Sequence, residues 1–376
     1  MPKRFIISGG GTGGHIFPAV SIAGALRARY PDCEILFVGA NGRMEMQRVP
    51  EAGYSIVGLD VRGIERKNLL KNFSVIFDFI KSCIKAKQIV REFAPDVAIG
   101  VGGYVSGAAM WAASSLGVPV VLQEQNSFAG LTNRFLAKRA SAICVAYDKM
   151  ERFFPADRIF KTGNPVRQNI LNNDINKEEA YQYFSLDKNK KTLLVIGGSL
   201  GAKTINQSLL SAIDELQSSP FQIIWQTGRQ YFPSIKEEFY SRGLNKIADC
   251  KPIIYSNMYV SDFISRMDYA YSVADVVISR AGASSISELS ILGKPSILVP
   301  SPNVAENHQF HNAMALKQEK AAVLVEDHEA SSKLITEALT LLADIERQVT
   351  FSKNIKKMAF EESAEKIVDT ISKFIQ

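Results

Sequence analysis

The stretch FIISGGGTGGH, residues 5–15, decides the fold, and LLVIGGSLGAK, residues 193–203, repeats its design about half a chain later. In each, a short apolar run that predicts a buried strand meets glycines and then a helical pattern. Glycines allow a tight turn, and the start of a helix offers N–H groups and a partial positive charge that suit an anion. Packing of a helix on a strand also needs glycine, so one such turn is weak evidence. Two of them favour twin nucleotide-fold domains that face each other across a cleft, over packing glycines alone.

Composition indicates an ordinary globular chain of about two domains. The chain has 376 residues, of which 46% are hydrophobic and 22% charged. Its four cysteines lie far apart without a Cys-x-x-Cys pair, which indicates a reducing compartment. No signal peptide is expected, because the apolar start runs at once into glycines. Residues 97–122 carry no charge and are long enough to span a bilayer, but their glycines favour a buried strand–helix–strand unit.

Positive charge is concentrated in the first half of the chain. Residues 1–166 carry 21 Lys and Arg against 13 Asp and Glu, although the whole chain has a net charge of only +6. Apolar side chains recur at helical spacing in this region: Leu69, Leu70, Phe73, Ile76, Phe77, Ile80 and Ile84. Basic residues flank them: Arg66, Lys67, Lys71, Lys81, Lys85 and Lys87. We expect an amphipathic helix that contacts an anionic membrane surface, and the alternative is a core-facing helix with a solvated basic edge.

Strand-like and helical segments alternate along both halves, which is typical of parallel sheets covered on both faces. The strand-like segments are 4–8, 34–38, 55–59, 97–101, 118–122, 142–145, 192–196, 222–225, 252–255, 276–279, 296–299 and 322–325. The segment Gly163-Asn164-Pro165-Val166 interrupts the alternation, which indicates a domain boundary near residue 165. We therefore predict doubly wound parallel-sheet α/β domains over residues 1–165 and 166–350. A C-terminal helix over 351–376 is expected to pack back on the first domain.

Ligands of such sheets bind beyond the carboxyl ends of the strands, and the unusual residues of this chain follow strands. The segment SRAGASSISE, residues 279–288, enters a helix whose N–H groups suit a phosphate or a sugar hydroxyl. Glu288 can bind a vicinal diol such as that of ribose, or it can form a capping box with Ser284 or Ser285.

Amide and imidazole side chains fill the next loop, residues 300–313, and suit neutral sugar hydroxyls. His308 and His311 alone lack a third metal ligand. Tyr104 and Asn126 each follow a strand, and each is either a cleft residue or a turn residue.

Eight segments in one order resemble a single family over nearly the whole chain. They are GGGTGGHIFPA (9–19), GGYVSG (102–107), EQNSFAGLTN (124–133), GNPVR (163–167), GGSLGAK (197–203), FISRM (263–267), RAGASSISEL (280–289) and NHQFHNA (307–313). The family is that of the peptidoglycan glycosyltransferases which add N-acetylglucosamine to undecaprenyl-pyrophosphoryl-N-acetylmuramyl-pentapeptide. The resemblance implies a GT-B fold of two Rossmann-like domains with an interdomain cleft, and UDP-N-acetylglucosamine as donor. Some members carry glutamine at the positions of Leu200 and His308.

The same resemblance implies the site residues. Those for the donor are Thr12, Gly13, Gly14, Asn126, Arg167, Ser199, Phe263, Ile264, Met267, Ala283, Ser284, Glu288, His308 and Gln309. Those for the acceptor are Gly11, Thr12, His15 and Tyr104. The resemblance assigns catalytic roles to His15, Asn126 and Glu288. It also implies that the uracil binds Phe263 and Ile264, that the ribose binds Glu288 and that a phosphate binds Ser199. The apolar stripe and its flanking charges, rather than the resemblance, predict membrane contact at Leu69, Leu70, Phe73, Ile76, Phe77, Ile80, Lys67, Lys71 and Lys81.

The implied chemistry is an in-line, inverting displacement at the anomeric carbon, with the C4 hydroxyl of the muramyl sugar as acceptor and UDP as leaving group. His15, the only histidine of the first half, is the first candidate for the general base. No Asp-x-Asp motif follows a strand, so neither a metal nor a cofactor is expected.

The expected partners are the lipid-linked acceptor, an anionic membrane surface and other cell-wall synthesis proteins, with no nucleic acid. The expected location is peripheral, at the cytoplasmic face of the bacterial cell membrane.

Three other functions compete with this one. A nicotinamide dehydrogenase also has a G-x-G-x-x-G turn, but it has no use for the second glycine turn. A sugar-nucleotide 2-epimerase shares the twin-domain architecture and is the stronger rival. A non-enzymatic binding or scaffold protein would consume no UDP-sugar.

Overall fold

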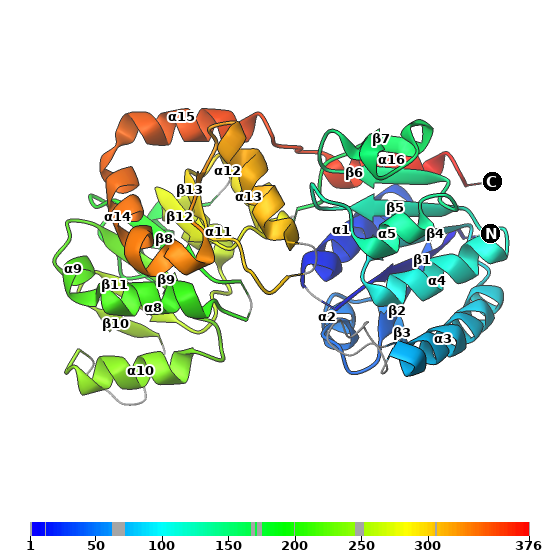
Figure 1. Ribbon diagram of the computed structural model, residues 1–376, viewed down its shortest axis with the longest axis horizontal. Coiled ribbons are helices and arrows are strands. Elements are labelled where there is room, and N and C mark those ends of the chain that lie inside the picture. Colours follow the sequence, from blue (N-terminus) through cyan, green and yellow to red (C-terminus); the bar gives the residue numbers. More distant parts are fainter. Residues whose placement is uncertain are drawn as a thin grey trace. The chain divides into compact units, whose positions relative to one another are not determined.

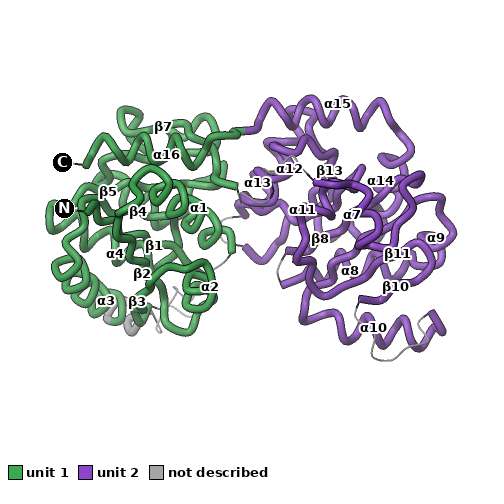
Figure 2. Tube along the Cα trace, turned by 180° about the vertical axis from the view of Figure 1, so that it is seen from behind, with its two compact units in different colours: residues 1–167, 360–376 green, residues 168–359 purple. Residues whose placement is uncertain are grey.

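The computed structural model describes residues 2–11, 13–61, 72–166, 170, 175–198, 200–244, 252–304 and 307–375, with the backbone alone for 72–77. The chain forms two compact units (Figure 1 and Figure 2). Unit 1 comprises residues 1–167 and 360–376, and unit 2 comprises residues 168–359. Each unit is built on a seven-stranded sheet.

Unit 1 holds a wholly parallel sheet with the strand order β3-β2-β1-β4-β5-β6-β7. Its strands are β1 (Arg4–Gly9), β2 (Glu34–Ala40), β3 (Ser55–Leu59), β4 (Val97–Gly102), β5 (Val120–Glu124), β6 (Ala142–Val145) and β7 (Ile159–Lys161). The sequence predicted the first six. It missed β7, because this edge strand has three residues and is not fully buried, so it lacks the apolar run that marks the others.

Helices cover both faces of this sheet, as the alternation of side chains along a strand requires. They are α1 (Gly13–Arg29), α2 (Glu45–Glu51), α3 (Asn72–Phe93), α4 (Tyr104–Ser115), α5 (Leu131–Leu136) and α16 (Ser363–Ser372), with 3₁₀ turns η2 (Met150–Arg152) and η3 (Ala156–Arg158). Phe5 and Ile7 pack with residues of α1 and α16, whereas Ile6 packs with those of α3, α4 and α5. The uncharged stretch 97–122 is thus a buried unit of β4, α4 and β5, as its glycines predicted. No helix in the described ranges is long and apolar enough to cross a membrane.

The C-terminal helix α16 completes one face of unit 1. Ile367, Val368 and Ile371 enter the same core as α1. The hydroxyls of Tyr30 and Ser372 lie 2.8 Å apart at its end. The predicted single helix over 351–376 is wrong in extent, because residues 351–356 complete α15 (Ile345–Lys356) of unit 2 and only α16 belongs to unit 1.

Unit 2 repeats the plan with the strand order β10-β11-β9-β8-β12-β13-β14. Its strands are β8 (Thr192–Ile196), β9 (Gln222–Gln226), β10 (Ile253–Tyr255), β11 (Met258–Ser261), β12 (Val276–Ser279), β13 (Ser296–Leu298) and β14 (Val323–Leu324). Among the strands that the structure describes in this unit, β10 alone runs antiparallel to its neighbour. The sequence missed β11, because the turn before it contains neither glycine nor proline; Ser256 itself adopts a positive φ of 51° there.

The helices of unit 2 follow the same alternation. They are α7 (Lys177–Tyr183), α8 (Lys203–Ser211), α9 (Ile213–Gln217), α10 (Phe232–Ser241), α11 (Met267–Val273), α12 (Ala283–Leu292), α13 (His308–Gln318), α14 (Ala330–Ala343) and α15, with the 3₁₀ turn η5 (Asp327–Glu329). Residues of α8, α10 and α14 share one core with Leu193, Val195 and Trp225.

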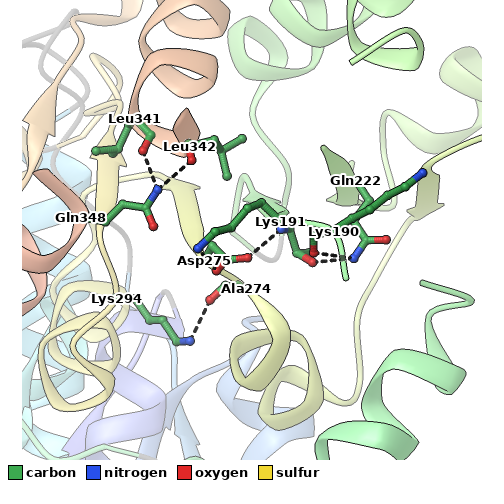
Figure 3. Close-up of polar contacts among 10 residues, drawn as sticks. Lys190, Lys191, Gln222, Ala274, Asp275, Lys294, Leu341, Leu342 and Gln348 are labelled. Carbon is green, nitrogen blue, oxygen red and sulfur yellow. Dashed lines mark hydrogen bonds and ion pairs between the residues drawn. The ribbon is translucent and has the colours of Figure 1, made fainter. Parts of the chain in front are cut away.

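A half-buried lysine lies at the amino ends of the strands of unit 2 (Figure 3). Lys294 donates from Nζ to the carbonyl of Ala274 at 2.8 Å. The neighbouring carboxylate of Asp275 binds Lys191 at 2.9 Å and the N–H of Thr192 at 2.8 Å. Burial, followed by the charge of Lys177, lowers the pKa of Lys294 to about 8, and Asp275 opposes that shift.

This shift predicts a pH dependence of stability. The ordinary lysine pKa is about 10.4, so from about pH 8 to 10 the unfolded chain holds a proton at Lys294 that the folded chain has lost. This group therefore makes the free energy of unfolding rise with pH, by about 1–3 kcal/mol over that window. Lys294→Met removes the rise. The measurement is urea unfolding followed by Trp225 fluorescence in a Trp111→Phe background, from pH 7 to 10. Exposed Lys188→Met is the control, and a constant difference between the wild type and Lys294→Met would contradict the assignment.

Candidate functional site

The first glycine turn of unit 1 is held by direct backbone packing. It follows β1 and leads into α1. A Cβ on Gly103, which has a φ of 86°, would lie 2.6 Å from the carbonyl oxygen of Gly10. Only glycine fits such an approach, so the turns after the neighbouring strands β1 and β4 are fixed against each other. Thr12 lies outside the described residues.

His15 lies beside this turn, in the first turn of α1. Its Nδ1 is 3.0 Å from the carbonyl oxygen of Gly10. A carbonyl only accepts, so Nδ1 carries the proton and the neutral ring has its lone pair on Nε2. The imidazole packs on Gly102, whose added Cβ would meet the ring at 2.9 Å. The fold thus fixes both the tautomer and the orientation of His15.

Glu45 is a buried carboxylate beneath the same turn that the sequence analysis missed. One of its oxygens accepts from the N–H of Gly11 at 3.0 Å, and the other accepts from the N–H of Ala40 at 3.1 Å. The side chain is fully buried. The Gly11 N–H predicted to face the acceptor therefore binds a carboxylate of the protein, which fixes the shape of the turn.

Asn126 follows β5 in a loop organised by Glu124. This buried carboxylate accepts from the backbone and side chain of Asn126 at 3.0 and 3.2 Å, from the N–H of Gly130 at 3.0 Å and from Asn133 at 2.9 Å. Burial raises the pKa of Glu124, and these hydrogen bonds oppose the rise. Because β1, β4 and β5 are neighbours in the sheet, His15, Tyr104 and Asn126 all follow the carboxyl ends of adjacent strands. Tyr104 begins α4 with an exposed ring.

The second glycine turn lies in unit 2, between β8 and α8. A Cβ on Gly201, which has a φ of 79°, would lie 2.2 Å from the carbonyl oxygen of Thr227 after β9. The two loops are therefore in backbone contact, as in unit 1. Ser199 of this turn and Arg167 both lie outside the described residues.

The segment after β11 offers one open aromatic ring. Phe263 is 38% exposed, whereas the side chains of Ile264 and Met267 are buried. The guanidinium of Arg229 lies 5.5 Å from the centre of the Phe263 ring. A ligand here would meet the ring of Phe263 and the backbone of Ile264 rather than the buried side chains.

Glu288 projects from α12, which follows β12. It is 6% exposed and accepts a hydrogen bond from Tyr271 at 3.0 Å. The capping-box alternative is wrong, because the residue that caps α12 is Gly282, which has no side chain to bond. Ala283 begins the helix, and among the described residues the buried hydroxyl of Ser284 has no hydrogen-bond partner. A buried hydroxyl without a partner beside a helix N-terminus suits a polar ligand.

Arg280 connects three segments at the carboxyl ends of the strands: the loop after β12, the loop after β13 and η5. Its guanidinium donates to the carbonyls of Val299 and Pro300, at 3.1 and 3.3 Å, and pairs with Asp327. Asp327 also accepts from Thr204 of α8 at 2.8 Å. Within the described part of the chain, Arg280 therefore stabilises the positions of these segments relative to one another.

His308 and Gln309 open α13, after β13. The side chain of Gln309 accepts from the N–H of Ser301 at 2.9 Å, which braces the loop between β13 and α13. No group of three His, Cys, Asp or Glu side chains that could hold a metal occurs within the described ranges.

Unit 2 thus places part of the predicted donor set beyond the carboxyl ends of β11, β12 and β13: Phe263, Ile264, Met267, Ala283, Ser284, Glu288, His308 and Gln309. The predicted donor residues Gly13, Gly14 and Asn126 belong to unit 1 instead. The sequence analysis missed Glu45, Tyr271 and Gln226. Gln226 is the last residue of the apolar strand β9. A polar residue at or just after the end of an apolar strand is the signal that identified Asn126 after β5, and the same signal identifies Gln226.

Comparisons with known proteins cover the whole chain. The N-terminal and C-terminal domains of glycosyltransferase family 28 match residues 5–145 and 192–368. The UDP-N-acetylglucosamine--N-acetylmuramyl-(pentapeptide) pyrophosphoryl-undecaprenol N-acetylglucosamine transferase of Parabacteroides distasonis is 55% identical, over 99% of this chain and 98% of that protein. A crystal structure of Acinetobacter baumannii MurG has a TM-score of 0.75 and 27% identity, covering 99% of this chain and 100% of that one.

A sugar-nucleotide epimerase shares the fold. The UDP-GlcNAc 2-epimerase from Neisseria meningitidis bound to UDP-GlcNAc has a TM-score of 0.67 at 14% identity, covering 99% of this chain and 100% of that one. At that identity the likeness concerns the fold alone.

Proposed function

This chain belongs to glycosyltransferase family 28, and we infer from that membership that it transfers N-acetylglucosamine from UDP-N-acetylglucosamine to undecaprenyl-pyrophosphoryl-N-acetylmuramyl-pentapeptide. The full-length likeness to the Parabacteroides transferase carries the assignment. The family and the two-domain Rossmann-like GT-B fold class predicted from the sequence are confirmed.

The donor is proposed to bind unit 2. The uracil stacks on the open ring of Phe263 and meets the backbone of Ile264, beside Met267; Arg167, also predicted for the donor, lies outside the described residues. Glu288 accepts from the ribose hydroxyls, and Tyr271 holds its carboxylate in place. A phosphate lies on the second glycine turn at Ser199, where helix N–H groups suit its charge. The sugar meets His308, Gln309 and the start of α12 at Ala283 and Ser284.

The acceptor is proposed to bind unit 1, at Gly11, Thr12, His15 and Tyr104, and the donor residues predicted in this unit are Thr12, Gly13, Gly14 and Asn126. Asn126 orients the transferred sugar. The acceptor oxygen at C4 attacks the anomeric carbon while the bond to UDP breaks on the opposite face, so the configuration inverts. UDP takes the bonding electrons, and fixed N–H dipoles stabilise the charge that develops on its β-phosphate. Nε2 of His15, which bears the lone pair of the fixed tautomer, takes the proton of the attacking hydroxyl.

A membrane surface is the proposed docking partner of unit 1, since the acceptor is a lipid. Ile80 and Ile84 of α3 are 52% and 66% exposed, whereas Cys83, Ala86 and Val90 pack into the core. The exposed pair argues against the alternative that the apolar stripe only faces the core. Lys81 adjoins this pair, and α5 adds two exposed residues, Leu131 and Phe135. Lys67, Leu69, Leu70 and Lys71 lie outside the described residues, as do the side chains of Phe73, Ile76 and Phe77.

The first test is transfer itself. Purified protein incubated with radiolabelled UDP-N-acetylglucosamine and a synthetic lipid-linked muramyl-pentapeptide is expected to move label into the lipid. UDP should be released only when the acceptor is present. Release without acceptor, or conversion of the donor to its 2-epimer, would favour the epimerase instead. No consumption of the donor would favour a scaffold protein.

The second test concerns His15. His15→Ala is expected to lower kcat by about 10²–10⁴-fold, the usual contribution of a general base. UDP affinity measured by calorimetry should stay unchanged, because UDP binds unit 2. The acidic limb of the pH–rate profile should also disappear. His328→Ala, an exposed histidine of η5, is the matched control. Turnover near that of the wild type would refute the role of His15.

The third test concerns membrane contact. Ile80→Asp with Ile84→Asp is expected to reduce flotation with anionic liposomes by about tenfold, because two exposed apolar side chains that would enter the membrane surface are lost and two negative charges are added. Ile345→Asp with Val349→Asp is the matched control, since this pair is equally exposed on α15 of unit 2. Raised salt should weaken binding of the wild type. Binding that ignores salt, or equal losses in both double variants, would remove the proposal.

A further inference from the structure

Gln226, the last residue of β9, bridges two loops of unit 2. Its Nε2 donates to the carbonyl oxygen of Gly198 at 3.0 Å, and its Oε1 accepts from the N–H of Ile264 at 3.1 Å. Gly198 belongs to the second glycine turn, residues 197–202, which we call the phosphate turn. Ile264 belongs to the segment after β11, residues 262–267, which we call the uracil loop.

The two backbone partners dictate which way the amide points. The carbonyl of Gly198 can only accept and the N–H of Ile264 can only donate, so the amide nitrogen must face the phosphate turn. Gln226 is only 5% exposed, so little water is available to replace either bond. An amide is the group of this size that satisfies both partners at once.

The sheet explains why this residue reaches both loops. β9 lies between β11 and β8 in the strand order, so its last side chain lies between the loops that follow its two neighbours. The next residue continues the connection. The N–H of Thr227 donates to Ser261 of β11 at 2.9 Å, and its carbonyl accepts from Asn206 of α8 at 2.8 Å.

We propose that Gln226 is a positioning residue that couples the phosphate turn to the uracil loop, so that a uridine diphosphate is bound as one unit. This inference rests on the proposed donor site. Gln226 holds the Gly198 carbonyl and the Ile264 N–H at a fixed separation. When uracil binds the uracil loop, the phosphate turn is therefore ordered as well, including the N–H groups that meet the diphosphate. The diphosphate of UDP then adds more binding affinity than it would if Gln226 did not connect the two segments.

The test compares uridine with UDP by calorimetry on the full chain. Gln226→Glu keeps an acceptor for Ile264 but sets a second acceptor against the Gly198 carbonyl, which pushes the phosphate turn away. UDP affinity should fall by about tenfold or more, the usual effect of a buried polar group left without its partner. Uridine affinity should change by less than about threefold. Gln226→Met removes both bonds and should weaken both ligands, which provides a second check if the glutamate variant folds poorly.

Gln222→Glu is the matched control, in the same strand. Gln222 is also buried, and its side chain accepts from the backbone N–H of Asp187 at 2.9 Å and donates to the carbonyl of Asp187 at 2.8 Å. It lies at the amino end of β9, where it also donates to the carbonyl of Lys190 at 3.2 Å (Figure 3). The Gln222→Glu variant should have a lower melting temperature than the wild type, but the ratio of its UDP affinity to its uridine affinity should be unchanged. An unchanged ratio in Gln226→Glu, or an equal shift in Gln222→Glu, would overturn the coupling. A wild type that binds neither ligand would instead overturn the proposed donor site.

Discussion

The rest of the structure depends on backbone packed against backbone at two glycine turns. In unit 1 the turn after β1 touches the turn after β4 at Gly10 and Gly103, and in unit 2 the turn after β8 touches the loop after β9 at Gly201. Neither approach leaves room for a Cβ. The contacts bring helix starts close to the ends of neighbouring strands, so that N–H groups from separate loops face the same region. The chemistry of the site follows from this close approach.

Buried carboxylates stabilise the loops around these turns. Glu124 ends β5, whereas Glu45 begins α2 and Glu288 lies in α12; all three are buried, and each accepts hydrogen bonds from N–H or O–H groups of neighbouring segments. A buried carboxyl group is costly unless donors meet it, so each of these groups holds its donors in one arrangement. Glu45 fixes the first glycine turn, Glu124 fixes the loop of Asn126, and Tyr271 fixes Glu288 in turn. The side chains nearest the proposed ligands are therefore held before any ligand binds.

Much of this architecture could be predicted from local sequence pattern. Apolar runs ending in glycine located β1 and β8, and polar residues after strands identified Asn126 and Glu288. The residues that the sequence analysis did not identify interact with partners far away in the chain, and no local sequence pattern records such pairs. Glu45 lies 34 residues from Gly11, Gln226 lies 28 residues from Gly198, and Arg280 lies 47 residues from Asp327. The short strands β7 and β11 escaped prediction for local reasons: β7 has three residues and is not fully buried, and the turn that separates β11 from β10 contains neither glycine nor proline.

The position of α16 bears on the order in which the protein matures during synthesis. One core of unit 1 uses Ile367, Val368 and Ile371, which follow all of unit 2 (residues 168–359) in the chain. The first half of the chain therefore cannot cover the apolar face of α1 until α16 has been made, so unit 1 cannot finish folding as an independent N-terminal domain before unit 2 is synthesised. An isolated N-terminal fragment would keep that face open to aggregation.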